Sequence, residues 1–444
     1  MLSQVPIIDS QSEIPVYRQL YIGLRDGILA GVLRDGERLP PTRELAQLMG
    51  LNRATVSAAY ALLEEEGLIS GQVGRGSFVH YRSGALSQEI SFATSRPAEE
   101  LFPLEEVRAL TTEVMRQSAT AILQLGSPFG YEPLRQYLME QATAEGVFDP
   151  EEDDLLITSG CQQALDLIHK ALMEPGETAV VEEPVYPGLK HAFEGRLSLS
   201  GTGIKFVTPS FRNPTGYTMT MAERHQLAQG RERLLVEIDI YSRLRYAGEP
   251  LPAVRGLGCQ HRCLLLRSFS KIAFPGLRVG WLIGPRPLVA KLAAAKQWTD
   301  LHSDQLSQAI LLEFARTGGL DRHLARVLTA GRERLRVTLE TLAAVLPPGS
   351  LFTRPEGGMN LWVTLPEGCD AAALLEKARR AGVSYLPGRY FGLSSGFNAS
   401  LRLSFAGLSP GRIAEGLRRL EPLFSEEARI AARMKEPAPE MAMV

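Results

Sequence analysis

The sequence predicts a multidomain protein: a small α+β unit, then a large α/β unit that ends in a smaller α+β subdomain. Three observations predict this fold class. The chain has 444 residues, which is more than one typical domain holds. Residues 1–82 carry short helical patterns and a Gly-rich hairpin, whereas in residues 90–424 apolar β-type runs alternate with longer helical patterns. Between them, the small polar residues 83–89 (SGALSQE) are typical of a linker. Residues 425–444 are expected to form a frayed helix and then a disordered tail.

Composition and charge exclude several classes of protein. Apolar residues make up 45% and charged residues 22% of the chain, which is ordinary for a globular protein that buries a core. No apolar run is long enough to span a membrane, and the N-terminus lacks the pattern of a secretory signal. Four cysteines are too few for a disulfide framework, and the Cys259–Cys263 pair lacks a second pair of metal ligands. We therefore expect a reduced, cytoplasmic protein without a metal site.

The first 82 residues predict three helices and a hairpin. An apolar stripe over Glu13–Ala30 indicates the first helix. Thr42 is a plausible N-cap for a short second helix, whose expected buried face consists of Leu45, Leu48 and Met49. Gly50 ends that helix, and Asn52 can cap a third helix over residues 53–66. The hairpin LISGQVGRGSFV follows. Two short helices joined by a tight turn, with a hairpin after them, predict a winged helix-turn-helix.

In such a module the second short helix enters the major groove of DNA and its N-terminal residues meet base edges. The net charge of residues 1–82 is −1, from eight arginines and nine acidic residues, so bulk charge does not favour DNA. A winged helix used for protein contacts remains the alternative. The residues expected at double-stranded DNA are Asn52, Arg53, Thr55 and Ser57 on the recognition helix, Arg43 on the helix before it, and Arg75 at the wing tip.

This segment resembles the GntR family of bacterial regulators. The resemblance rests on IPVYRQL, G-x-R-L-P-P-T-R-E-L-A, N-R-A-T-V-S-A-A-Y, L-E-E-E-G-L-I and G-R-G-S-F-V, which together span almost the whole module.

The large unit predicts a mainly parallel sheet covered by helices on both faces, because its apolar runs are separated by helical patterns. The expected strands of this sheet are Leu155–Thr158, Thr178–Val181, Ile204–Thr208, Leu234–Ile240, Cys263–Ser268 and Val279–Ile283. Two later runs, Met359–Thr364 and Leu401–Phe405, indicate the smaller subdomain.

Several residues at strand ends carry chemistry. Lys271 follows the run CLLLRSFS and can form a Schiff base with an aldehyde, while Arg278 can clamp a phosphate and Ser268 can donate to it. Small residues at the start of a helix present backbone N–H groups to an anion. They are Ser159, Gly160 and Cys161. The remaining candidates are Ser270 beside Lys271, Asn213 as a donor to a phenolate oxygen, Tyr186 as a stacking aromatic, and Asp239 and Tyr241 at the end of LLVEIDIY.

Together these residues resemble a fold type I aminotransferase that uses pyridoxal 5′-phosphate (PLP), over about residues 90–420. The similarity is greatest to the kynurenine/α-aminoadipate branch, through GYEPLR, SGCQQALDL, PSFRNPTG, SFSKIAFPGLRVGW, RPEGGMNLWV and LRLSFAGL. The resemblance implies a catalytic, cofactor-holding Lys271, a phosphate site at Arg278 and Ser268, and ring-oxygen contacts from Asn213 and Tyr241. It also implies that Arg402 binds a substrate carboxylate.

A GntR module followed by such a domain resembles the MocR/GabR family of transcriptional regulators. The resemblance implies a head-to-tail homodimer in which PLP and a small amino compound at the large domain alter DNA binding.

The sequence departs from the aminotransferase pattern at four places. The acid that faces the pyridine nitrogen is replaced by Ile238, and Asp239 lies one residue late, on the opposite face of a regular strand. Leu125 stands where the pattern has a phosphate-binding tyrosine of the partner subunit. The loop Ser91–Ser95 lacks its usual glycines. Only 15 residues separate Phe193 from Pro209, where the pattern holds a further strand and helix, so we expect a packing defect near the cofactor.

Without an acid at the ring nitrogen, PLP is a poor electron sink, so we expect transamination to be weak or absent. Three functions remain open: a DNA-binding regulator with a PLP-dependent sensor domain, an active aminotransferase with an appended winged helix, and a regulator whose large domain only dimerises.

Overall fold

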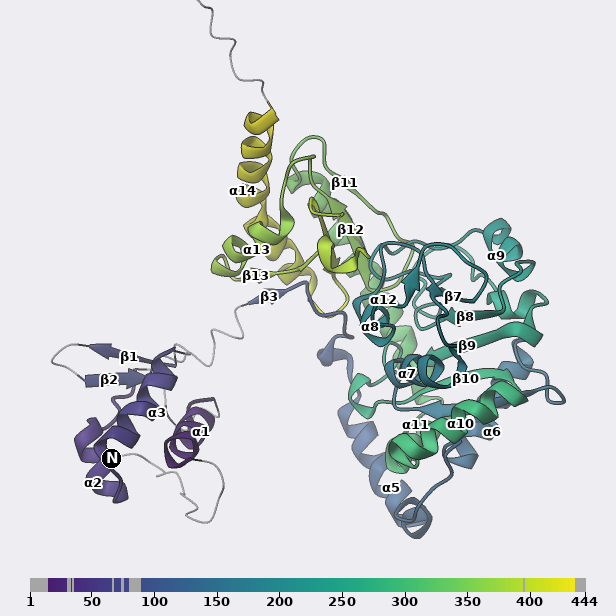
Figure 1. The fold of residues 1–444 in the computed structure, drawn as a ribbon, viewed down its shortest axis with the longest axis horizontal. Helices are drawn as coiled ribbons and strands as arrows, with labels where there is room; N and C mark the ends of the chain where they lie inside the picture. Colours follow the sequence, from purple (N-terminus) through teal and green to yellow (C-terminus); the bar gives the residue numbers. More distant parts are fainter. Residues whose placement is uncertain are drawn as a thin grey trace, which may run out of the picture. The chain divides into compact units, whose positions relative to one another are not determined.

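The computed structural model describes residues 15–29, 33, 36–65, 68–72, 76–79, 89–393 and 396–435. The chain forms two compact units, Met1–Glu89 and Ile90–Val444 (Figure 1). Within the described residues, no helix is both long and apolar enough to cross a membrane. The same residues contain no cluster of histidine, cysteine and acidic side chains that could hold a metal ion.

The first unit is the predicted winged helix-turn-helix. Three helices pack around one core that includes Leu24, Leu45, Val56 and Leu63, and the two strands form an antiparallel hairpin. Its elements are α1 (Val16–Leu29), α2 (Thr42–Met49), α3 (Arg53–Glu65), β1 (Ile69–Gln72) and β2 (Gly76–Val79).

The turn between α2 and α3 follows from its residues. Gly50 ends α2 in the left-handed region at φ 64°, which glycine adopts without a steric cost. The side-chain oxygen of Asn52 accepts a hydrogen bond from the Ala54 amide at 3.0 Å, as expected for a residue that precedes a helix.

Two expectations for α2 are wrong. Thr42 is the first residue of the helix, and Pro41 holds the N-cap position without a side-chain bond. Leu48 is 60% exposed. Because the buried residues are Leu45 and Ala46, the inward face of the helix is rotated toward Ala46, and this turns Leu48 toward solvent.

The large unit contains the predicted sheet, with seven strands in the order β4-β10-β9-β8-β7-β5-β6. β10 is antiparallel to its neighbours β4 and β9, and the other pairs are parallel. The strands are β4 (Asp153–Thr158), β5 (Ala179–Val180), β6 (Leu197–Ser198), β7 (Ile204–Val207), β8 (Leu234–Ile238), β9 (Cys263–Ser268) and β10 (Gly280–Pro285).

Helices cover both faces of this sheet, as predicted. On one face Leu156, Leu264 and Leu282 pack against α7 and α10, which Figure 1 shows in front of the strands. On the other face Leu155 and Leu265 pack against α6, α11 and α12. The helices of the unit are α5 (Leu104–Ile122), α6 (Glu132–Ala144), α7 (Cys161–Leu172), α8 (Pro187–Ala192), α9 (Met221–Ala228), α10 (Arg286–Asp300), α11 (Gln305–Arg316), α12 (Gly319–Val345), α13 (Ala371–Arg380) and α14 (Pro410–Lys435).

The shortened segment after Phe193 keeps a strand and lacks only the helix. β6 pairs with the edge of β5, and residues 199–203 alone lead from β6 across the end of β5 to β7. A Cβ on Gly201 would lie 3.2 Å from Val180 Cγ2, so the crossing chain passes directly over that strand. The packing defect is a cavity of about 40 Å³ lined by Val185, Phe206 and Ile238 among others.

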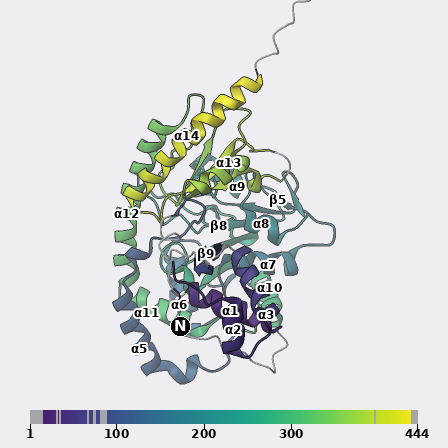
Figure 2. The same cartoon turned by 90° about the vertical axis from the view of Figure 1, so that its left-hand side faces the viewer.

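The smaller subdomain contains a four-stranded sheet in the order β11-β12-β15-β14 and a separate β13–β3 pair. In Figure 2, α14 crosses α12, and the two helices pack together. The strands are β3 (Ile90–Ser91), β11 (Leu351–Phe352), β12 (Asn360–Thr364), β13 (Val383–Ser384), β14 (Leu386–Pro387) and β15 (Ser400–Ser404).

The tail begins as a helix, as expected, but this helix is packed and not frayed, and residues 436–444 lie outside the described residues. α14 continues to Lys435, and Ala431 is buried. Glu427 accepts a hydrogen bond from the Asp370 amide. Gly368 lies close to Ala431, because a Cβ built on this glycine would be only 3.3 Å from the Cβ of Ala431. These contacts hold the last turns of α14 against the start of α13.

Candidate functional site

A cavity of about 430 Å³, here called the front cavity, lies where β8 and β9 end and α7 begins. Carboxyl ends of neighbouring parallel strands are the usual place for a ligand in such a sheet. Most of the predicted site residues line it. The described lining residues are Ala93, Thr94, Ser95, Cys161, Gln162, Leu165, Tyr186, Thr208, Asn213, Ile238, Ile240, Tyr241, Ser268, Ser270, Lys271, Arg278 and Arg402.

The charge of the front cavity is positive. Lys271, Arg278 and Arg402 line it, and no carboxylate is present among its described lining residues. Cations that face one cavity without a neutralising acid favour a ligand with more than one negative group. The cavity is therefore suited to a phosphate and a carboxylate at the same time.

Lys271 is half-buried, and its Nζ donates a hydrogen bond to the Ser95 carbonyl at 2.6 Å. Burial, followed by the positive charge of Arg402, lowers the pKa of Lys271 to about 8. A larger fraction of its amine is then neutral near pH 7 than for an exposed lysine, whose pKa is about 10.4. The neutral amine is the form that attacks an aldehyde.

Arg278 lies against the start of α7, where Gly160 has no side chain to block it. Its Nη2 donates to the Ser159 carbonyl at 3.3 Å, and a Cβ on Gly160 would lie 2.5 Å from that nitrogen. Gly160 also has φ 80°, a conformation that side chains disfavour. The glycine therefore allows the guanidinium to reach the helix N-terminus.

Gly160→Ala is expected to lower the affinity for PLP about tenfold, because it displaces a guanidinium that can pair with the phosphate. Gly276→Ala is the matched control, since a Cβ there meets nothing within 4 Å. Fluorescence titration of each purified variant with PLP measures the effect. Equal affinity of the two variants would contradict the role of Gly160.

The serines near the cavity have defined partners. The Ser268 hydroxyl donates to the Val279 carbonyl at 3.1 Å and accepts from the Ser270 amide at 3.0 Å. Its single proton is thus used within the protein, which differs from the expectation that it donates to a phosphate. Ser159 lies beside the cavity with its hydroxyl 3.2 Å from Ser303 Oγ. Burial raises the pKa of the Cys161 thiol to about 12, so this side chain is a neutral wall residue.

Arg402 and Tyr241 form the buried side of the cavity. Arg402 Nη1 donates to Asn213 Oδ1 at 3.2 Å, and Nη2 donates to the Ala93 carbonyl. Its buried Nε has no hydrogen-bond partner among the described residues. Burial raises the pKa of Tyr241 and keeps its phenol neutral. Tyr186 stands at the more open side and is 43% exposed.

The expectation that Asp239 contacts the cofactor is wrong. Ile238 and Ile240 line the front cavity, whereas Asp239 points to the other side and pairs with Arg267 Nε at 3.1 Å. The alternation of side chains along the chain explains this placement. The ring-nitrogen position is thus apolar.

Three front-cavity contacts were not singled out from the sequence. Gln162 and Thr208 line the cavity, and Ser95 binds Lys271 through its carbonyl. Gln162 follows Cys161 at the start of α7, so the same helix-start signal could have found it. A contact through a backbone carbonyl, such as that of Ser95, does not require a particular residue type, so the sequence does not indicate it.

The predicted DNA-contacting residues occupy one part of the first unit. Arg43, Asn52, Arg53 and Ser57 are exposed, and Thr55 is half-buried. Arg75 lies outside the described residues. The exposed start of α3 is available to a groove of DNA.

Comparison with known proteins agrees with both units. The model of the gntR family of bacterial regulatory proteins matches residues 16–79, and that of aminotransferase class I and II matches residues 200–420. The chain is 35% identical to aromatic-amino-acid aminotransferase 1 of Thermococcus litoralis, over 77% of this chain and 89% of that protein. It is 28% identical to the probable rhizopine catabolism regulatory protein MocR of Rhizobium meliloti, over 94% and 95% of the two chains.

The chain belongs to the family of aminotransferases of class I and II. Its large domain is an aminotransferase class I and II domain, and its first domain is a GntR domain. Among solved structures, LysN of Thermus thermophilus, an α-aminoadipate aminotransferase complexed with N-(5′-phosphopyridoxyl)-L-leucine, superposes with a TM-score of 0.71 at 31% identity. The match covers 85% of this chain and 99% of that one.

The cofactor of this aminotransferase class I and II domain is PLP, and the front cavity fits it. An aldehyde requires a nucleophilic amine, which Lys271 supplies, and a phosphate requires cations, of which Arg278 is one. When bound, PLP supplies an electron-withdrawing ring to an attached amine. The apolar Ile238 does not favour a proton on the ring nitrogen.

Proposed function

We propose that this chain is a transcriptional regulator whose large domain holds PLP on Lys271 and senses a small amino compound. The observation that carries the proposal is that Lys271 and Ile238 line the same cavity. Lys271 can hold the cofactor, whereas Ile238 stands in place of the acid on which transamination relies. Such a site suits reversible recognition of an amine better than turnover, and a cytoplasmic DNA regulator requires only recognition.

Different residues of the front cavity bind different groups of PLP and of the amino compound. Arg278 and the start of α7 hold the phosphate, with Ser270 beside them, while Asn213 and Tyr241 contact the ring oxygen. Tyr186 stacks on the ring. Arg402, which lines the cavity, binds the carboxylate of the amino compound. Arg402 gains most from this arrangement, because it is buried and its charge is then neutralised, whereas Arg278 is exposed.

The sensed compound is an amino acid or a related amine. Relatives of the large domain are named for aromatic amino acids and α-aminoadipate. A carboxylate on the compound explains why a buried arginine faces the same cavity as Lys271, since an unpaired buried charge is costly.

A homodimer is the form we propose to act on DNA. Leu123 and Leu125 beyond α5 are 74% and 78% exposed, and Trp298 on α10 is 90% exposed. Large apolar side chains that are this exposed are typical of surfaces that another chain covers. Two winged helices on one dimer would each read a half-site, and the short linker of residues 83–89, about 25 Å long at most, limits their placement.

An active aminotransferase is the second candidate. The match to an aminotransferase over 89% of its length favours it, as does the presence of Lys271, Arg278 and Arg402 in one cavity. Efficient turnover by the wild type, at about 1–10³ per second, would support this candidate against the sensor.

Arg53→Ala in the full chain is expected to weaken binding to the promoter beside its own gene about tenfold or more, and to remove the preference over random DNA. The reason is that an arginine at the start of a recognition helix can bond a base edge bidentately. Fluorescence titrations against both DNAs at two salt concentrations measure affinity, preference and the number of phosphate contacts.

Arg18→Ala is the matched control, because it removes the same charge from an exposed position of α1 in the same unit. It should leave the preference intact. Equal affinity of the wild type for promoter and random DNA, unchanged by Arg53→Ala, would refute a sequence-specific regulator.

A further inference from the structure

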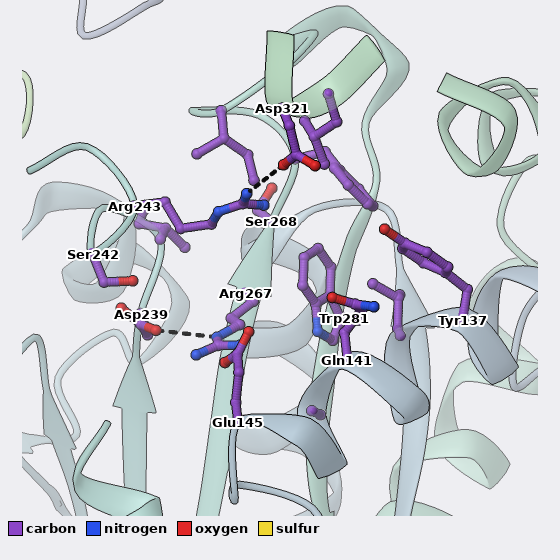
Figure 3. Close-up of a pocket in the computed structure, with 16 residues that line it drawn as sticks. Tyr137, Gln141, Glu145, Asp239, Ser242, Arg243, Arg267, Ser268, Trp281 and Asp321 are labelled. Carbon is purple, nitrogen blue, oxygen red and sulfur yellow. Dashed lines mark hydrogen bonds and ion pairs between the residues drawn. The ribbon is translucent and has the colours of Figure 1, made fainter. Parts of the chain in front are cut away.

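A second cavity, here called the rear cavity, lies on the other side of the ends of β8 and β9 from the front cavity. Its volume is about 190 Å³. Figure 3 shows Asp239 and Arg267 rising from the two strands, with Tyr137, Gln141 and Glu145 reaching in from α6. The cavity is where the displaced acid Asp239 points, and the front site makes no use of it.

Acidic side chains outnumber basic ones in the rear cavity. Its described lining contains three carboxylates, on Glu145, Asp239 and Asp321, against two guanidinium groups, on Arg243 and Arg267. Arg267 pairs with Asp239 at 3.1 Å and with Glu145 at 2.5 Å, and Arg243 pairs with Asp321 at 3.2 Å. One negative charge is left over.

Each of these carboxylates uses one oxygen for its arginine and has a second oxygen that can accept a hydrogen bond. Arg267 bonds Oδ2 of Asp239 and Oε2 of Glu145, and Arg243 bonds Oδ1 of Asp321. Among the described residues, the other oxygen of each group has no hydrogen-bond partner. Asp239 is only 7% exposed and lines the rear cavity, so its second oxygen is reached from that cavity. A carboxylate oxygen in such a cavity can accept a bond from a cationic donor.

The floor of the rear cavity is apolar and aromatic. Trp281 and Phe269 are buried, with ring centroids 4.9 Å apart, and Leu138 lies beside them. Figure 3 shows Tyr137 and Gln141 at the wall, and neither side chain has a hydrogen-bond partner among the described residues. The indole face of Trp281 is the aromatic surface that attracts cations best.

We propose that the rear cavity binds a small monocationic amine with an apolar body. The ammonium group donates to Asp239 and Glu145 and neutralises the excess negative charge, while the apolar body lies on Trp281. The Gln141 amide and the Tyr137 hydroxyl complete its polar contacts. This site is distinct from the front cavity, whose three cations repel an amine that lacks an anionic group.

The position of the rear cavity links it to the cofactor site through one short segment. Phe269 and Ile272 line the rear cavity, whereas Ser270 and Lys271 line the front cavity. Likewise Asp239 lies between Ile238 and Ile240. An amine bound at the rear therefore contacts residues adjacent in the chain to those that hold PLP.

Calorimetric titration of the full chain with N,N-dimethyl-2-phenylethylamine tests the proposal. This tertiary amine cannot condense with the aldehyde of PLP, so it does not report on the front cavity. One molecule should bind per chain. The single N–H of this ammonium bonds one carboxylate at a time, but both carboxylates attract its charge. Asp239→Asn and Glu145→Gln should therefore each weaken binding about tenfold, because each removes a negative charge beside the cation.

Two controls separate binding in the rear cavity from binding elsewhere on the protein. Glu140→Gln removes the same charge from an exposed neighbour on α6 outside the cavity and should leave the affinity unchanged. Lys271→Ala should also bind the amine normally, so failure of the PLP site does not affect this result. Glu145 is about half-exposed, so its variant remains informative if Asp239→Asn does not fold. Absence of binding, equal binding by Glu145→Gln, or loss in Lys271→Ala would each overturn the proposal.

Discussion

Lys271→Ala is expected to abolish covalent retention of PLP. Wild-type protein incubated with PLP, then reduced with borohydride, should carry the cofactor on Lys271 alone. The expected effect is complete because Lys271 is the single lysine among the described residues of the front cavity. Its lowered pKa, about 8, makes the amine reactive near neutral pH. Mass spectrometry of the digested protein measures the adduct.

Lys291→Ala is the control for this experiment, since Lys291 is exposed on α10 and lies outside the front cavity. That variant should be labelled like the wild type. A wild-type protein that never yields an adduct on Lys271 would leave only the regulator whose large domain dimerises.

Ile238→Asp is expected to raise the rate of transamination about tenfold or more from a weak or absent wild-type activity. The carboxylate would occupy the position from which Ile238 lines the front cavity, and an acid there keeps the ring nitrogen protonated. The measurement is keto acid released from phenylalanine, kynurenine or α-aminoadipate by protein loaded with PLP.

Ile238→Asn provides the matched control, because it has the shape of the aspartate without its charge. It should not stimulate turnover. Stimulation by both variants would point to relief of bulk instead of protonation, and rapid turnover by the wild type would refute the argument from Ile238 outright.

The winged helix and most strands could be predicted from local signals. Gly50 and Asn52 mark the turn between α2 and α3, because a left-handed residue and a cap are needed wherever a helix ends and another begins. The run Cys263–Ser268 is strand β9 with the predicted bounds. A two-residue strand such as β6 is too short for any periodicity, so it was not predicted.

Errors arose where distant contacts decide burial. Leu48 is apolar at a helical spacing, yet the packing of α2 on its core turns it outward. The last turns of α14 have the composition of a frayed helix, but contacts with residues near Asp370 and Gly368 pack them against the subdomain. Local composition does not contain these contacts, which join residues about 60 positions apart.

The sequence by itself determined the order of the two domains, and it predicted the cofactor lysine and the loss of the ring acid. These features are local: a motif names Lys271, and a period of two places Asp239 on the wrong face for the ring. Only the tertiary structure decided where Asp239 points, because its partner Arg267 belongs to the neighbouring strand. It also decided that Gly160 makes room for Arg278, and that a second cavity lies behind the first. The physical reason is that hydrogen bonds and ion pairs depend on distances between atoms, and chain folding alone brings residues from different strands within a few ångströms.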